Sequence, residues 1–321
     1  MKIEHLYVIG NGFDIHHGIK SKYIDYRDWL ERNGEYDAID AIDRTFGPCD
    51  DEWWKNFEQK LGMANMLEIA IEEAIQNSPN FASDNFRDAD WYDAENAVDL
   101  RLNKAYFIIR ESLQRWANQL NGGEASKKVR LADGNRVFLN FNYSDTLESL
   151  YHIPQESILY IHGKASNGDD LILGHGIPQE QLEGKVKETI KDNDDENDSA
   201  FNFITQRAKD AAVSNVYAQR KMVEKIIANN ELWFAGLHSV RYIHFWGHSF
   251  GEVDLPYFRK ILESVDKGRV EIEVSYYEET DKKAIAAFMK SEGIMVGKGI
   301  GLYHTMKLSE ILLNTENKKN D

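Results

Sequence analysis

The chain has 321 residues, a net charge of −16 and a hydrophobic content of 42%. The apolar fraction is sufficient for a packed core, whereas the acidic excess repels phosphate backbones and argues against broad nucleic-acid binding. The single cysteine, Cys49, excludes an intramolecular disulfide and a four-cysteine zinc module, and it is typical of a reducing compartment. Because the sequence lacks a run of about 18 apolar residues, we expect a cytoplasmic protein without a membrane span.

A short apolar strand at residues 6–9 leads into the turn Gly10-Asn11-Gly12. Glycine has no Cβ and tolerates positive φ, so this turn can bend sharply and present its N–H groups to a ligand. The next predicted element is a helix at 23–32. Strand, glycine turn and helix begin a doubly wound α/β domain, in which the turn binds phosphates. The full dinucleotide-binding spacing is missing, so a turn without a ligand is an equally good interpretation of this segment alone.

Two long helical patterns follow without a strand between them, at 51–78 and 92–120. Their tryptophan and phenylalanine side chains are typical of a packed core. We therefore expect a helical insertion at about 51–120, after the first strand and helix.

Apolar runs predict further strands at 136–141, 158–161, 171–173, 240–246 and 270–276, and a short edge strand at 294–296. Helical patterns are found at 178–191, 200–232, 254–264, 281–290 and 306–313, and the acidic run at 191–198 is typical of a loop. Strands that alternate with helices indicate a mainly parallel sheet covered on both faces. We expect a single α/β domain over 1–321, with a Rossmann-like sheet of about six strands and helical insertions at about 51–120 and 178–232.

Four of the predicted strands end in polar or glycine-bearing turns. These turns are Gly10-Asn11-Gly12, Asn142-Tyr143-Ser144-Asp145, His162-Gly163 and Gly247-His248-Ser249. The carboxyl ends of parallel strands lie on one edge of the sheet, where ligands bind at the switch in strand order. The sequence therefore predicts a shared site at that edge.

Four motifs in chain order carry a resemblance to a known family. They are V-I-G-N-G-F-D, F-N-Y-S-D-T-L-E, I-H-G and G-H-S-F-G-E-V-D. The ordered set resembles the AbiH family of bacterial abortive-infection proteins, which act in phage defence. The resemblance extends from residue 3 to about residue 290.

The same layout is similar, more remotely, to sirtuin-like NAD-binding domains. A G-A-G-x-S turn followed by a G-I pair is matched in spacing by Gly10, Gly12, Gly18 and Ile19. A T-N-Y-D-x-x-L-E segment is similar to the stretch that begins at Asn142. There Ser144 takes the aspartate position and Asp145 comes one residue later.

This second resemblance implies NAD+ as substrate or ligand. It places the pyrophosphate at Gly10-Asn11-Gly12, Asn142 at the nicotinamide ribose and His162 as the base. The wider candidate set comprises Asp145 for catalysis and Phe13, Asp14, Gly18, Gly247 and Ser249 for binding. Cleavage of the N-glycosidic bond passes through an oxocarbenium-like state that a positioned amide and a base active near pH 7 can stabilise. The lack of a four-cysteine module favours glycohydrolysis over protein deacetylation.

Other interpretations of these residues stay open. His162 is also compatible with a core histidine, and Asn142 with a residue that starts a helix. Asp14 stands at the sirtuin-like serine position, where it can contact a ribose hydroxyl or repel a phosphate. The His244 and His248 pair runs from a strand into a turn rather than along a helix face, so we expect no metal site.

The sequence thus predicts a phage-defence effector that binds NAD+ and hydrolyses it to nicotinamide and ADP-ribose. One alternative is a module that senses NAD or another nucleotide without turnover. A second is a toxin or nuclease that acts on another nucleotide or on nucleic acid, which the negative charge disfavours. Assembly as a homo-oligomer and a phage-derived trigger both stay open.

Overall fold

The computed structural model describes residues 2–80, 83–187 and 199–313, so the predicted loop at 191–198 lies outside the described residues. The chain divides into two compact units. The first comprises Met1–Lys22, Arg115–Ile172 and Met222–Asp321, and the second comprises Tyr23–Gln114 and Leu173–Lys221.

Within the described residues, the first unit contains a seven-stranded sheet in the order β3-β2-β1-β4-β5-β7-β6, and every pair of neighbours is parallel. The strands are β1 (His5–Ile9), β2 (Arg136–Asn140), β3 (Ile158–Tyr160), β4 (Tyr242–Trp246), β5 (Glu271–Ser275), β6 (Met295–Val296) and β7 (Leu302–Met306). The predicted α/β fold with a parallel sheet is confirmed, with seven strands rather than about six. The strand order switches direction between β1 and β4, which is where open α/β sheets bind ligands.

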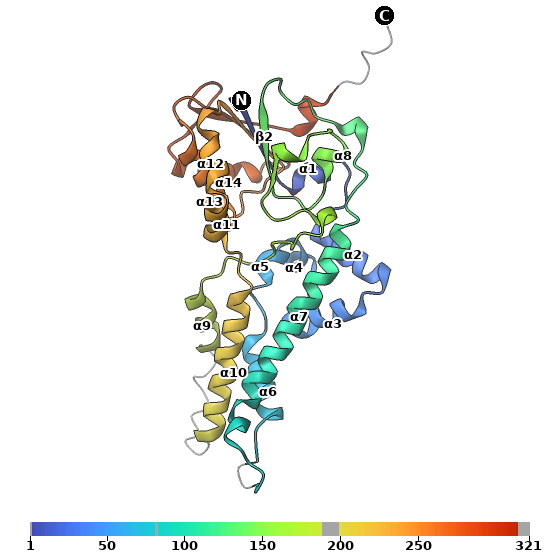
Figure 1. Cartoon of the computed structure of the whole chain (residues 1–321), viewed down its shortest axis with the longest axis vertical. Helices are drawn as coiled ribbons and strands as arrows, with labels where there is room; N and C mark the ends of the chain where they lie inside the picture. The colour runs from blue at the N-terminus through green and yellow to red at the C-terminus, as the bar shows by residue number, and fades with distance from the viewer. Residues whose placement is uncertain (1, 81–82, 188–198, 314–321) are drawn as a thin grey trace, which may run out of the picture. The chain divides into compact units, whose positions relative to one another are not determined.

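Helices cover the two faces of this sheet. The helices of the first unit are α1 (Asn11–His16), α8 (Thr146–Ser149), α11 (Val223–Asn229), α12 (Glu231–Ala235), α13 (Leu255–Ser264) and α14 (Asp281–Ser291). Figure 1 shows α11 to α14 grouped on one side of the sheet and α1 and α8 on the other. The alternation of β1 explains both layers, because Leu6 and Val8 enter one apolar core whereas Tyr7 and Ile9 enter the other.

Two elements predicted from the sequence were wrong, the strand at 171–173 and the helix at 306–313. The run at 171–173 is not a strand, although Leu171 and Leu173 are buried. Its apolar character reflects packing, and the β-bridge nearby joins His175 to Arg220. The predicted helix at 306–313 is replaced by the end of β7 and a single 3-10 turn, Leu308–Ile311.

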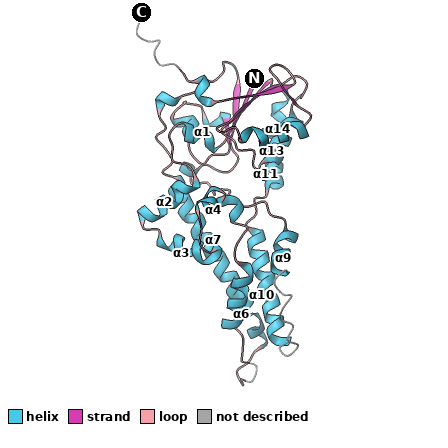
Figure 2. Ribbon diagram, turned by 180° about the vertical axis from the view of Figure 1, so that it is seen from behind, coloured by secondary structure: helices cyan, strands magenta, loops and turns pink. Residues whose placement is uncertain are grey.

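The second unit is helical, as the ribbon in Figure 2 shows. Its helices are α2 (Tyr23–Asn33), α3 (Tyr36–Phe46), α4 (Asp51–Lys55), α5 (Phe57–Lys60), α6 (Met66–Gln76), α9 (Gln179–Lys187) and α10 (Ser199–Ala218), together with most of α7 (Asp93–Ala117). The predicted aromatic core is confirmed, because Trp53, Trp54 and Phe57 are buried and their rings pack on one another.

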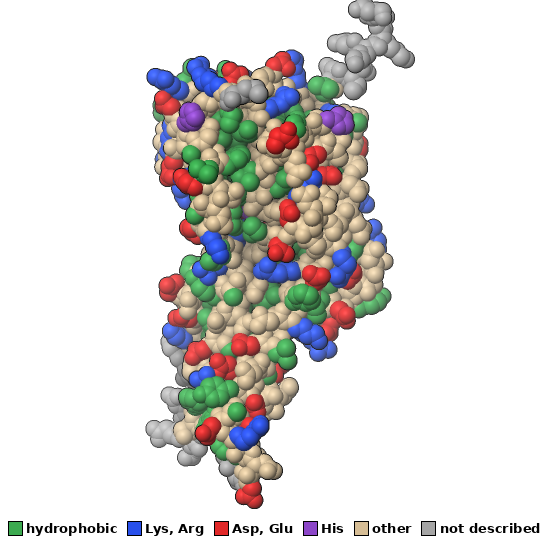
Figure 3. Space-filling view, viewed as in Figure 1, with side chains coloured by type: hydrophobic (Ala, Val, Ile, Leu, Met, Phe, Trp, Pro, Cys, Tyr) green, Lys and Arg blue, Asp and Glu red, His purple; other side chains and the backbone are tan. Residues whose placement is uncertain are grey.

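None of the helices in the described part of the chain combines the length and the apolar character that crossing a bilayer requires. On the face shown in Figure 3, basic and acidic side chains are interspersed.

Candidate functional site

The turn after β1 packs directly on the turn after β4. The Gly10 N–H donates to the carbonyl oxygen of Trp246 at 2.9 Å, and the Gly12 N–H donates to that of Gly247 at 2.7 Å. A Cβ atom at Gly10 would lie 2.7 Å from the oxygen of Gly247, and one at Gly247 would lie 2.0 Å from the nitrogen of Phe13. Glycine is required here because the two backbones approach within contact distance. The N–H groups of Gly10 and Gly12 therefore have partners inside the protein.

The other residues of the predicted binding set fall into two groups. Phe13 is fully buried, and Gly18 takes a φ of 80° just after α1. These two positions serve packing and the end of the helix. Asn11 and Ser249 are exposed beside the joined turns, and the Asn11 amide donates to the carbonyl oxygen of Ser21 at 2.9 Å. The short helix α1, which begins at Asn11, was not predicted from the sequence, whereas the predicted helix at 23–32 is found as α2.

A buried carboxylate links α1 to the segment after β2. Asp14 accepts hydrogen bonds from the hydroxyls of Ser144 at 2.5 Å and Thr146 at 2.7 Å. Burial raises the pKa of Asp14 to about 6, although hydrogen bonds from Ser144, Thr146 and Asn142 act in the opposite direction. The Asn142 amide also donates to the carbonyl oxygen of Gly10 at 3.1 Å. Asp14 and Asn142 therefore lie together at the carboxyl edge of the sheet, as predicted for a shared site.

Two histidines share one carboxylate at the same edge. His162 follows β3, His248 follows β4, and Asp254 precedes α13. Asp254 Oδ1 lies 3.9 Å from Nε2 of His162, and its Oδ2 lies 3.6 Å from Nε2 of His248. The ring of Phe141 packs edge-on against both imidazoles, with centroid distances of 5.0 and 4.8 Å.

This arrangement suits acid–base chemistry, because a carboxylate near an imidazole favours its protonated form and can steady it while a proton is held. His162 is buried, and the Asp254 side chain is 20% exposed, so the group borders solvent. Sequence reasoning missed Asp254. It is the last residue of the G-H-S-F-G-E-V-D motif, and that position was the available signal.

Asp145 stands at the start of α8, where its carbonyl oxygen accepts from the N–H groups of Glu148 and Ser149. Its carboxylate has a different environment. Within the described residues, Oδ1 of Asp145 is buried and has no hydrogen-bond partner. A buried carboxylate oxygen has a strong demand for donors. Oδ1 of Asp145 therefore has acceptor capacity that the described residues leave unused.

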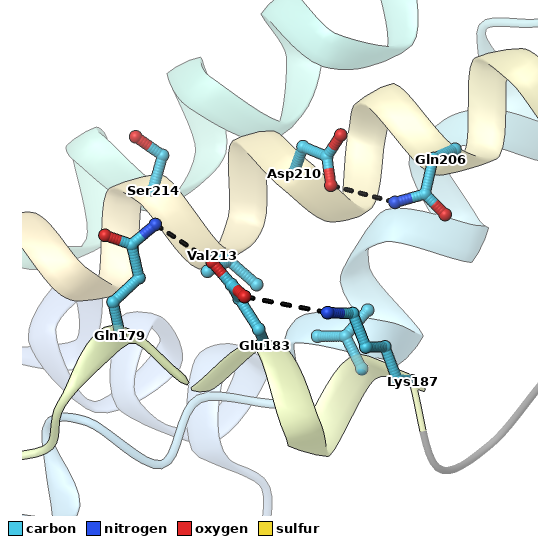
Figure 4. Close-up of a pocket in the computed structure, with 8 residues that line it drawn as sticks. Gln179, Glu183, Lys187, Gln206, Asp210, Val213 and Ser214 are labelled. Atoms are coloured by element: carbon cyan, nitrogen blue, oxygen red, sulfur yellow. Dashed lines mark hydrogen bonds and ion pairs between the residues drawn. The ribbon is translucent and has the colours of Figure 1, made fainter. Parts of the chain in front are cut away.

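A separate hollow of about 310 Å³ lies between α9 and α10 in the second unit. Figure 4 shows its polar side chains pairing along each helix: Gln179 with Glu183, Glu183 with Lys187, and Gln206 with Asp210. Pairs spaced four residues apart on exposed helices are a common surface feature. This hollow gathers no side chains toward a common point, so it is not the candidate site.

Among the residues that the structure describes, no three histidine, cysteine or acidic side chains are placed to hold a metal ion. The side chains that the sheet edge brings together carry imidazole, carboxylate and amide groups.

The fold and the site define an α/β protein with a candidate small-molecule site at the switch point of a parallel sheet. The chain belongs to the AbiH family: the family model described as bacteriophage abortive infection AbiH matches residues 6–276. Membership implies a role in phage abortive infection. Comparison with curated proteins and with solved structures gave no match.

Proposed function

We propose that this AbiH protein binds NAD+ at the carboxyl edge of its sheet and hydrolyses the N-glycosidic bond to nicotinamide and ADP-ribose. The observation that carries the proposal is the position of His162 beside Asp254, at the end of a strand next to the one that leads to Asn142 and Asp145. Loss of NAD+ deprives the infected cell of its main hydride carrier, which fits the abortive-infection role of the family.

In the reaction, a water oxygen attacks C1′ of the nicotinamide ribose while the bond from C1′ to the pyridinium nitrogen breaks. The bonding electron pair goes to that nitrogen, so nicotinamide leaves as a neutral molecule. The proton of the attacking water passes to His162, and the negative charge of Asp254 stabilises the resulting imidazolium. The geometry thus gives the base a partner for the charge that it acquires.

The amide of Asn142 and the carboxylate of Asp145 have the groups needed to hold the ribose hydroxyls. Oδ1 of Asp145 meets no donor within the described residues, and a ribose hydroxyl would supply one. The N–H groups of Gly10 and Gly12 already donate to β4 and its turn, so in this proposal the phosphates contact the exposed Asn11 and Ser249 instead. This modifies the pyrophosphate position that the sirtuin-like resemblance implies.

Titration of NAD+ into the purified protein, with turnover measured on the same samples, separates an enzyme from a sensor. We expect His162→Ala to keep NAD+ affinity within about threefold and to lose at least about a hundredfold in turnover, the range of general-base catalysis. Asn142→Ala is expected to weaken binding. His238→Ala, an exposed histidine of the same unit, is the matched control. Tight binding without turnover in any variant would support the sensor, and absence of binding would reject the dinucleotide site.

A further inference from the structure

A second group of titratable side chains lies on one face of the sheet rather than at its edge. Tyr7, His244, Glu273 and His304 are successive cross-strand neighbours on β1, β4, β5 and β7. Residues in register on parallel strands point to the same face. The four side chains therefore form a row across the centre of the first unit, and the proposed reaction does not use them.

Glu273 is the hub of this row. Its Oε1 accepts from the indole N–H of Trp246 at 2.9 Å and lies 3.1 Å from Nδ1 of His244. The row continues from His244 to His5, because Nε2 of His244 lies 3.2 Å from Nδ1 of His5. Burial acts to raise the pKa of Glu273. The net effect is nevertheless a lowered pKa, because the hydrogen bond and charge of His244, the hydrogen bond from Trp246 and the charge of His304 outweigh burial. Glu273 is therefore a carboxylate at neutral pH.

A cavity of about 430 Å³ opens over this row. Tyr7, His244, Trp246 and Glu273 line it from the sheet, and the segments 130–133 and 310–312 form the wall. The wall is braced by a hydrogen bond from the N–H of Arg130 to the carbonyl oxygen of Ile311 at 2.7 Å. Helices α11 to α14 pack on the other face, and on this face the loop at 130–133 and the turn that ends at Ile311 border an open hollow of small-molecule size.

The charges that line the cavity favour a cation. The residues that line it include three with a carboxylate, Asp133, Glu273 and Glu310, and one with a guanidinium, Arg130. The second oxygen of Glu273 lies 3.6 Å from Nε2 of His304, beyond hydrogen-bond range, so it retains lone pairs for a ligand donor. The side chains of Tyr7 and Trp246 also line this space, and both are buried, so they give the acidic groups an apolar floor.

We propose that this cavity binds a small organic cation with N–H donors, an amine or a guanidinium, whose charged head pairs with Glu273. The site is separate from the sheet-edge site, so the inference does not rest on NAD+ hydrolysis. The apolar and acidic lining together favour a compact alkyl-linked cation.

Calorimetric titration of the full chain with agmatine, which carries both a guanidinium and a primary amine, tests the proposal. We expect saturable one-to-one binding and at least a tenfold loss of affinity in Glu273→Gln, which keeps the size of the side chain and an acceptor for Trp246. Glu310 is an exposed residue of the wall, so Glu310→Gln should lower the affinity for agmatine several-fold without a change in the core.

Glu271→Gln is the matched control, because Glu271 lies two residues earlier on β5 and does not line the cavity. N-butylurea, a neutral molecule of similar shape, should not bind. Three results would each overturn the site. The first is an equal loss of agmatine affinity in Glu271→Gln and Glu273→Gln, and the second is an affinity for N-butylurea equal to that for agmatine. The third is no saturable binding of agmatine at millimolar concentration.

Discussion

The N–H of Gly12 donates to the carbonyl oxygen of Gly247 at 2.7 Å, so the turns after β1 and β4 are held together backbone to backbone. Glycine pairs of this kind are usually read as phosphate-binding turns. Here close approach of two protein segments already requires them, and the ligand-binding edge is built around the joined turns.

Replacement of Gly247 by alanine is expected to destabilise the protein by more than about 3 kcal/mol, because steric overlap and a strained φ act together. The residue has a φ of 71°, and a Cβ atom there would overlap the backbone at Phe13. The free energy of unfolding in urea is the measurement. Gly251→Ala in the same loop is the control, since its Cβ would meet only Oγ of Ser249 at 3.8 Å. A similar loss in both variants would contradict the packing described.

Asp14→Asn is expected to change how stability depends on pH. The pKa of Asp14 is raised from 3.8 to about 6 in the folded protein, so the folded state holds the proton more tightly than the unfolded state. Its stabilising contribution is complete below pH 4 and is lost as the pH rises to about 6. The stability of the wild type relative to the variant should therefore fall by about 2 kcal/mol between pH 4 and pH 7.

Urea unfolding of both proteins at several pH values measures this difference. Asp37→Asn on α3 serves as the control, because Asp37 is exposed. A difference between wild type and Asp14→Asn that stays constant over this range would show that Asp14 does not titrate as described.

Asp254→Asn is expected to reduce kcat of NAD+ hydrolysis by about tenfold or more while KM changes little, since the lost charge acts on a protonated base and not on bound substrate. The carboxylate lies 3.9 Å from His162. Steady-state kinetics supply the two constants, and Glu252→Gln, an exposed neighbour, supplies the comparison. If the two variants behaved alike, Asp254 would have no part in the reaction.

The second unit contains a buried ion pair whose loss should be costly. Nζ of Lys221 lies 2.7 Å from Oε2 of Glu58, and the Lys221 side chain is only 1% exposed. Removal of the carboxylate in Glu58→Leu should destabilise the unit by about 3 kcal/mol, because it takes away the negative charge paired with a buried ammonium. The double variant Glu58→Leu/Lys221→Met should recover much of this loss.

Thermal and urea unfolding of the single and double variants test this pair. Asp40→Asn, which breaks the exposed pair with Arg44, should change stability by less than about 0.5 kcal/mol. A single Glu58→Leu variant as stable as Asp40→Asn would show that the buried pair contributes nothing.

The sheet could be predicted from the sequence because most of its strands are apolar runs bounded by glycine and polar turns. β7 could not, since His304 and Thr305 interrupt its apolar pattern. His304 belongs to the polar row on the sheet, so the residue that obscured the strand is a neighbour of Glu273 in that row. The strand predicted at 171–173 was wrong for the opposite reason. Its apolar residues are buried, but they lie outside the sheet.

The candidate site was predictable as a group of turns but not as a set of contacts. Asn142 and Asp14 were assigned to one edge, and they lie together there. The pairing of His162 with Asp254 depends on how a loop before α13 folds over the edge. The bond between His244 and Glu273 depends on the register of neighbouring strands, which a single sequence does not specify.

The most direct test of the proposed function is release of nicotinamide from NAD+ by the purified full-length protein, followed by chromatography with identification of both products. We predict equimolar nicotinamide and ADP-ribose from the wild type and from His238→Ala, and neither product from His162→Ala. Intact NAD+ after prolonged incubation with the wild type, or equal release by His162→Ala, would contradict hydrolysis at this site.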